Sequence, residues 1–151
     1  IHMGGKVGVL VEIDGCTCDA THELAHDIAL QIAAAKPLYI KTEEVPAEVI
    51  DHEKEILIAQ IKNDPKLANK PQQIIEKMVE GKVGKYYDEN CLLKQAFVKD
   101  PSLTIEQVLK NFNAKAGKTL SIARFTRFEM GEGLEKKNED FAAEVAAQMK
   151  K

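Results

Sequence analysis

The chain is poor in the residues that mark nucleic-acid-binding and disulfide-rich proteins. It has no tryptophan, 5% aromatic residues, three cysteines and, among its 21 basic residues, only two arginines. That composition leaves few aromatic rings or guanidinium groups on which RNA bases could stack. Because the formal net charge is -3 and the sequence pI is about 5.9, no global basic field attracts nucleic acid or an anionic membrane. We therefore expect neither a nucleic-acid partner nor a membrane partner.

Long apolar runs are also missing. No stretch approaches the ~20 apolar residues that a membrane-spanning helix needs, and no signal peptide is visible. The cysteines Cys16, Cys18 and Cys91 make an odd count, and two of them are separated by one residue, which does not suit a disulfide framework. These features predict a protein of the reducing cytoplasm.

The sharpest candidate for chemistry is the group Cys16, Cys18, His22 and His26, which falls within eleven residues. The two histidines are four residues apart, so they share a helix face and could both bind one metal ion. However, the spacing Cys-x-Cys is tighter than that of a zinc knuckle. A histidine pair on a helix face beside two small cysteines is the simpler interpretation, and we expect no metal and no other cofactor.

Motifs for covalent or nucleotide chemistry do not occur in the sequence. There is no Gly-x-x-x-x-Gly-Lys phosphate loop, and Gly131-Glu132-Gly133 places an acidic residue between its glycines, where it would repel phosphate. This triplet instead predicts a turn that needs positive φ. The carboxylates are scattered over helix faces, and Ser102 and Ser121 have no evident base partner. We therefore expect a binding protein and not an enzyme.

The two arginines, Arg124 and Arg127, lie next to phenylalanines in the longest strand candidate, residues 119–130. Such interleaving can bind single-stranded nucleic acid, but neighbouring glutamates cancel the positive charge. A structural strand with solvated arginines is the better interpretation. Strict alternation places Phe125 on one face and Phe128 on the other, together with Ile122, which predicts burial on both faces.

Periodicity and turn residues predict the order of the elements. Residues 6–13 are rich in valine and isoleucine and predict a strand, and apolar residues at helical spacing predict five helices. The helices are expected at residues 19–35, 46–62, 72–90, 104–117 and 140–149, and further strands at 91–98 and 119–130. Because regular βα units do not separate the strands, we expect an α+β fold with a small antiparallel sheet packed against helices.

The two central helices predict an inserted antiparallel helical hairpin, a coiled coil, at residues 46–90. The C-terminal core subdomain then comprises residues 4–45 and 91–151, and residues 1–3 have the appearance of a vector remnant. A lone helical pair is only marginally stable, so its remaining apolar surface is expected to meet a partner or a second copy. A homodimer, with the chain acting as an oligomerisation module, is the alternative function.

The tail carries the most specific resemblance. Residues 124–133 (RFTRFEMGEG), followed by residues 140–149 (DFAAEVAAQM), closely resemble the C-terminal end of bacterial translation elongation factor Ts. Upstream blocks resemble the same family in the same order: KVGVLVEI, HDIALQIAAAKPLYI, VPAEVIDHEKEI, KPQQIIEKMVEGK and LLKQAFVKDPSLTIEQVL. The likeness extends over residues 6–151, and several independent motifs in order make it specific.

The resemblance implies a guanine nucleotide exchange factor that binds the GDP form of elongation factor Tu and releases GDP without covalent chemistry. It implies that the hairpin projects from the core, and that the core packs on the β-barrel domain of elongation factor Tu remote from the nucleotide. The family's contact positions fall on Val7, Gly8, Gln31, Phe97 and Val98. The terminal helix, with Phe141 and Val145, is implied to reach the nucleotide domain.

Some features depart from the family. Gln31 stands where some members have histidine, and Lys99 replaces an expected apolar residue. The family's ubiquitin-associated-like domain and first core half, with a Thr-Asp-Phe motif that wedges beside the Mg²⁺ site, have no counterpart in the 151 residues. We therefore expect an expressed C-terminal fragment that binds elongation factor Tu weakly and exchanges GDP poorly.

Overall fold

The computed structural model describes residues 1–15, 19–67 and 69–134. Helices and strands mix in this part of the chain, which confirms the α+β class, with two two-stranded antiparallel sheets in place of a single small one. The predicted helix at 140–149 lies outside the described residues. The main elements are β1 (Val7–Asp14), α1 (Asp19–Ala35), α2 (Ala47–Asn63), α3 (Gln72–Asn90), β2 (Ala96–Phe97), β3 (Asp100–Thr104), α4 (Ile105–Ala116) and β4 (Ser121–Glu129).

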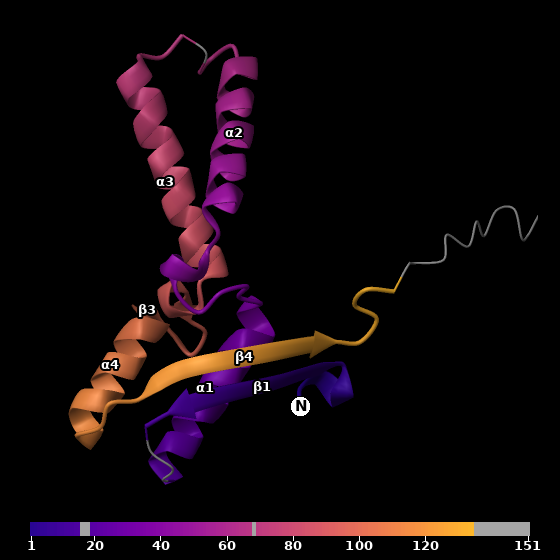
Figure 1. Cartoon of the computed structure of the whole chain (residues 1–151), viewed down its shortest axis with the longest axis vertical. Helices are drawn as coiled ribbons and strands as arrows, with labels where there is room; N and C mark the ends of the chain where they lie inside the picture. The colour runs from indigo at the N-terminus through magenta and orange to yellow at the C-terminus, as the bar shows by residue number, and fades with distance from the viewer. Residues whose placement is uncertain (16–18, 68, 135–151) are drawn as a thin grey trace, which may run out of the picture.

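Strands β1 and β4 form an antiparallel ribbon that joins the two ends of the described chain (Figure 1). The register is regular from Val7 to Glu12 and then shifts at Ile13, which pairs with Ile122. The extra residue is Ala123, so a β-bulge interrupts the alternation of side chains along β4.

Because of the bulge, the side chains of β4 are distributed over the two faces of the ribbon differently from the prediction. Ile122 and Phe125 both pack into the main core, although strict alternation places them on opposite faces. Phe128, which pairs with Gly8, is 59% exposed. The prediction of burial on both faces is therefore wrong, because among the described residues helix α1 packs against the ribbon and leaves the face of Phe128 open.

The main core forms where α1 meets segments from the second half of the chain. The predicted stripe of α1 is buried as expected, at Leu24, Ile28 and Ile32. Its partners in this cluster are Leu92, Phe97, Ile105, Leu120 and Ile122. Burying each such side chain contributes about 1.5–3 kcal/mol, so this cluster holds the ribbon, α1 and α4 together.

The segment predicted as a strand at 91–98 is only partly extended. It begins with a 3-10 turn, Leu92–Lys94, and only Ala96–Phe97 forms a strand, which pairs with β3. Helix α4 then starts at the predicted cap: the Thr104 hydroxyl accepts from the Gln107 N–H at 3.3 Å, and the Gln107 side chain accepts from the Thr104 N–H at 2.9 Å. This capping box satisfies two N–H groups that the helix itself leaves free.

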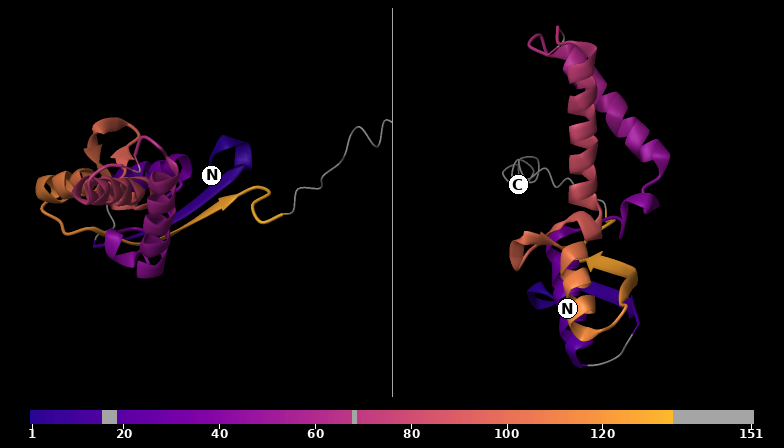
Figure 2. Two further views of the ribbon diagram at one scale, coloured as in Figure 1. Left: turned by 90° about the horizontal axis from the view of Figure 1, so that it is seen from above. Right: turned by 90° about the vertical axis from the view of Figure 1, so that its left-hand side faces the viewer.

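Helices α2 and α3 project together from the rest of the molecule (Figure 1). The axes of the two helices are inclined to each other. The helices diverge at their outer ends in Figure 1 and at their base in the right-hand view of Figure 2. A second apolar cluster fills the base of the pair, around Val45, Ile50, Val83 and Cys91. At this base Tyr39 and Cys91 form a parallel bridge, which ties the segments that enter and leave the pair.

The arginines of β4 differ in their surroundings. Arg124 is exposed and pairs with Glu12 across the ribbon. The side chain of Arg127 is only 10% exposed and pairs with Glu129 at 2.8 Å, so the prediction of solvated arginines is wrong for Arg127. None of the helices in the described ranges combines the length and apolar character that a bilayer crossing requires.

Candidate partner-binding surface

A groove of about 840 Å³ lies between β1 and the first half of α1. Strand β1 contributes its edge opposite β4, and α1 contributes an exposed polar face. The lining residues are Val9, Leu10, Val11, Asp19, His22, Glu23, Ala25, His26, Asp27 and Lys99. Open main-chain groups on a strand edge, next to mixed charges on a helix, form a surface suited to contact with another protein.

The turn after β2 borders this groove and presents an apolar side chain to solvent. Phe97 is buried in the main core, whereas Val98 is 46% exposed. The Lys99 ammonium group pairs with the Asp27 carboxylate on α1. The two neighbours of Val98 in the chain are thus held, one by packing and one by an ion pair, and Val98 itself remains accessible.

Gln31 holds the same turn from inside the molecule. Its side chain is fully buried, and its Oε1 accepts a hydrogen bond from the Val98 N–H at 2.8 Å. Its Nε2 donates to the carbonyl oxygen of Ala96 at 3.1 Å and to the Gln95 Oε1 at 3.2 Å. Both ends of the amide are therefore bonded, as burial of a polar group demands.

Gln95 extends this network to the base of the α2–α3 pair. Its Nε2 donates to the carbonyl oxygen of Glu89 at 2.8 Å and to that of Ala35 at 3.2 Å. One buried amide thus connects the last turn of α1, the last turn of α3 and, through Gln31, the turn at Val98. The projecting helices and the candidate surface therefore share one hydrogen-bond network.

The structure separates the predicted contact residues into accessible and buried ones. Val98 is exposed and Gly8 is partly exposed, so both can touch a partner directly. Val7, Gln31 and Phe97 are buried and support the surface from within. Phe141 and Val145 lie outside the described residues. In this conformation the side chain of Gln31 is not accessible to a partner, and its role in binding stays a prediction.

A second charged contact lies where α1 ends beside β4. The Lys36 ammonium group donates to the Glu129 carboxylate at 2.8 Å, and Arg127 reaches the same oxygen. The hydrogen bond from Lys36, followed by that from Arg127, lowers the pKa of Glu129 below its ordinary value.

A third titratable group, Cys91, lies at the base of the α2–α3 pair. Burial and the neighbouring carboxylates of Glu44 and Glu43 raise the pKa of its thiol.

His22 and His26 share one face of α1, as their spacing predicts, and both line the groove. Their predicted companions Cys16 and Cys18 lie outside the described residues. Among the residues that the structure describes, no group of three or more histidine, cysteine or carboxylate side chains is placed to hold a metal ion.

Sequence reasoning missed Gln95 and Asp27, which fasten the candidate surface. Lys94 and Gln95 interrupt an otherwise apolar run, CLLKQAFV, and polar residues inside such a run were the available signal. Asp27 is four residues before Gln31 on the same face of α1, but its partner Lys99 is 72 residues away. Only the fold brings that pair together.

Comparison with known proteins assigns the chain to a family. The family model described as "Elongation factor TS" matches residues 1–132, which include all the described elements. The chain belongs to the elongation factor Ts family. Elongation factor Ts of Desulforamulus reducens is 54% identical over 99% of this chain and 70% of its own length. Its counterpart in Carboxydothermus hydrogenoformans is 53% identical over the same shares, and that of Geobacter sulfurreducens is 49% identical over 97% and 68%.

These relatives identify the chain as a translation elongation factor of the Ts family. The match begins at residue 1, and His2 forms an antiparallel bridge with Val7. The first three residues therefore fall inside the region of family similarity. Their origin in a vector stays a prediction.

Proposed function

We propose that this elongation factor Ts chain binds the GDP form of elongation factor Tu in the cytoplasm and serves its guanine nucleotide exchange. The observation that carries the proposal is an exposed apolar residue, Val98, held on a rigid base. Buried Phe97, the Gln31 amide and the Lys99–Asp27 ion pair all hold the turn around it. A preorganised apolar contact is typical of sites that bind proteins, since little side-chain freedom is lost on binding.

The proposed contact extends from Val98 along the groove to the edge of β1 at Gly8. Gly8 leaves open space, because nothing lies within 4 Å of the position that a Cβ would occupy. A partner backbone can therefore approach β1 closely at this residue. Phe141 and Val145 are proposed as further contacts, with the nucleotide domain of elongation factor Tu.

Binding and exchange are proposed to be separable in this polypeptide. No Thr-Asp-Phe sequence occurs in its 151 residues, so the groups that the family uses beside the Mg²⁺ site have no counterpart here. Coupling between two ligands requires contacts that differ between the two states of the protein. We propose that the chain by itself binds elongation factor Tu and accelerates GDP release only weakly.

The test of binding is titration calorimetry with purified elongation factor Tu bound to GDP. Val98→Asp places a charge at the proposed contact and is expected to weaken binding about tenfold or more, as for a central interface residue. Ile58→Asp is the matched control, because Ile58 is also a partly exposed apolar residue but lies on α2. Equal loss of affinity in both variants, or none in Val98→Asp, would contradict the proposed surface.

Exchange is measured separately by stopped-flow release of a fluorescent GDP analogue from elongation factor Tu. The expected result is slow release at concentrations where calorimetry shows binding. Stimulation equal to that of a relative that contains the Thr-Asp-Phe motif would refute the proposed separation of binding and exchange.

A second candidate function is self-association through the α2–α3 pair, acting as a coiled coil. Three isoleucines of the pair are more than a third exposed, namely Ile56, Ile58 and Ile74. Sedimentation at several concentrations tests this candidate, and Ile58→Asp should dissociate a dimer formed through them. A tight dimer that has no affinity for elongation factor Tu would favour this function over the first.

A further inference from the structure

The outer half of the α2–α3 pair contains a second groove, separate from the proposed contact with elongation factor Tu. It encloses about 490 Å³ between the two helices, a volume within the range of ligand-binding clefts. Both helices and the start of their connection contribute to it. The lining residues are Leu57, Gln60, Ile61, Asp64, Leu67, Lys77, Met78, Gly81 and Lys82.

The floor of this tip groove is apolar. Leu57 and Ile61 lie one turn apart on α2, and Met78 faces them from α3. Gly81 follows Met78 by three residues on the same face of α3. Nothing lies within 4 Å of the position that a Cβ would take at Gly81, so the groove is open where this side chain is missing.

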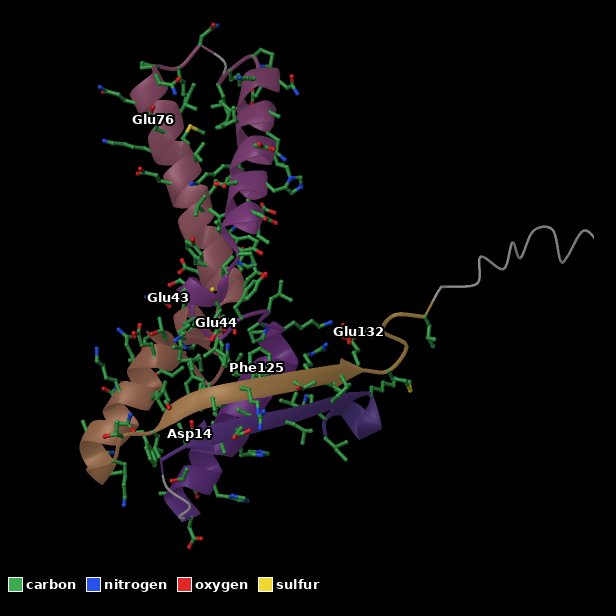
Figure 3. The ribbon with its side chains drawn as sticks, viewed as in Figure 1. Asp14, Glu43, Glu44, Glu76, Phe125 and Glu132 are labelled. Carbon is green, nitrogen blue, oxygen red and sulfur yellow. The ribbon has the colours of Figure 1, made fainter. Side chains whose placement is uncertain are left out.

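The charges of the pair are divided along its length. The outer half, residues 62–82, carries more lysines than carboxylates: Lys62, Lys66, Lys70, Lys77 and Lys82 against Asp64, Glu76 and Glu80. The base has the opposite excess: Glu43, Glu44, Glu48, Asp51, Glu53, Glu55, Asp88 and Glu89 against Lys41, Lys54 and Lys85. Figure 3 shows Glu43 and Glu44 at this base and Glu76 near the outer end of α3.

The lysines of the outer half have no carboxylate partner among the described residues. Two of the three carboxylates nearby are engaged locally. Asp64 accepts a hydrogen bond from the Lys66 N–H at 2.8 Å, and Glu76 accepts one from the Gln72 side chain at 3.2 Å. Lys77 and Lys82 line the groove itself, so an apolar floor is bordered by unpaired positive charge.

We propose that the tip groove binds an amphipathic helix of a partner protein, with apolar residues on one face and carboxylates beside them. A helix in a groove buries side chains at a spacing of three and four residues, which matches the row of Leu57 and Ile61 opposite Met78. Carboxylates flanking that face would meet Lys77 and Lys82 and fix the orientation. RNA is the poorer fit, because residues 62–82 contain no arginine and no aromatic residue on which a base could stack.

The experiment uses two fluorescent helical peptides of about 18 residues, or five turns. Both carry leucines at positions i, i+3, i+4 and i+7, and they differ only in having glutamates or lysines at the flanking positions. Fluorescence anisotropy with the full chain is expected to show the acidic peptide binding about tenfold more tightly or better. Higher salt should weaken that binding, because the flanking charges are exposed.

Two matched pairs of variants locate the site. Gly81→Leu fills the groove and is expected to weaken the acidic peptide about tenfold, whereas Gly84→Leu, on the same helix but outside the lining, should leave binding unchanged. Both positions have open space for a Cβ, and leucine favours a helix more than glycine does, so both variants should fold, as circular dichroism will verify. The double change Lys77→Glu with Lys82→Glu should abolish the preference for the acidic peptide, while Lys110→Glu with Lys115→Glu on α4 should retain it.

Four results would overturn the proposal. These are equal affinity for the two peptides, no detectable binding of the acidic peptide, binding that is insensitive to Gly81→Leu, and displacement of the acidic peptide by an RNA oligonucleotide that binds more tightly. Sedimentation adds one more decisive outcome. If Gly81→Leu dissociates a dimer of the chain, then a second copy occupies the groove and the partner helix does not.

Discussion

Gln31 and Val98 are 67 residues apart in the sequence, and the Gln31 Oε1 accepts the Val98 N–H at 2.8 Å. The bond joins a buried residue of α1 to an exposed apolar residue of the candidate surface. We therefore propose that Gln31, a contact position implied by the family resemblance, acts on binding through Val98 and not by touching the partner. Val98 lies over α1, and its position depends on the buried side-chain amide of Gln31 beneath it.

The variant Gln31→Leu tests this dependence. It removes the hydrogen-bond partner of the Val98 N–H, the Ala96 carbonyl oxygen and the Gln95 Oε1, and each group left buried and unsatisfied costs about 1–3 kcal/mol. We expect a lower free energy of unfolding in urea and, in addition, weaker binding to elongation factor Tu. Gln73→Leu, at an exposed position of α3, is the control and should stay within about 0.5 kcal/mol. Loss of stability with unchanged binding would show that Gln31 has no role in presenting Val98.

The Lys99–Asp27 ion pair should contribute little to the free energy of unfolding, because both side chains are partly exposed. The two side chains are 52% and 28% exposed, and exposed pairs are worth about 0–1 kcal/mol. A double-mutant cycle with Lys99→Ala and Asp27→Ala, measured by urea unfolding, is expected to give a coupling energy in that range. A coupling well above 1 kcal/mol would mean that the pair is shielded from solvent screening.

Because one face of the ribbon is open, the two phenylalanines of β4 are expected to contribute differently to the free energy of unfolding. Phe125 packs against the main core, so Phe125→Ala is expected to destabilise the fold by about 2–4 kcal/mol. Phe128 is 59% exposed, and Phe128→Ala should change stability by less than about 1 kcal/mol. Thermal and urea unfolding of the two variants provide the comparison, and similar losses in both would indicate that Phe128 is covered.

The contact between Lys36 and Glu129 predicts the direction in which the pKa of Glu129 is shifted. Because Lys36 and Arg127 stabilise the carboxylate, the pKa of Glu129 lies below its ordinary value of 4.5. The folded state gains from this contact above the ordinary pKa and loses the gain as the pH falls through the lowered pKa. NMR titration of the Glu129 carboxyl group should show the lowered pKa, and Lys36→Met should move it upward. A pKa unaffected by Lys36→Met would contradict the assigned cause.

Cys91 is expected to be chemically quiet in the folded protein. Burial raises its pKa above the ordinary value of 9.0, and the thiolate is the reactive form. Alkylation followed by mass spectrometry of the Cys91 peptide should be slow in native protein and fast in urea. The same shift predicts that stability declines as the pH rises above the pKa of the unfolded thiol, because the unfolded chain then releases its proton first. Cys91→Ala should reduce this decline, and rapid native labelling would show that the base of the α2–α3 pair opens.

The local elements of this protein could be predicted from sequence because they depend on neighbouring residues. The four-residue repeat of α1, the cap at Thr104 and the glycine at Gly117, with a φ of 59°, act within one or two helical turns. The structure contains the corresponding helices, and the family resemblance is confirmed by the family-model match over residues 1–132 and by a relative that is 54% identical over 99% of the chain. The site was predicted less completely, because its members meet only across distant segments.

The sequence by itself determined the helices α1 to α4, the strands of the ribbon, the α+β class and membership of the elongation factor Ts family. The tertiary structure decided which residues are accessible. The bulge at Ala123 changed the faces of β4, burial turned Gln31 into an internal support, and folding brought Lys99 to Asp27. The physical reason is that periodicity reports which residues prefer a helix or a strand, whereas exposure and charge pairing depend on which distant segment packs against them.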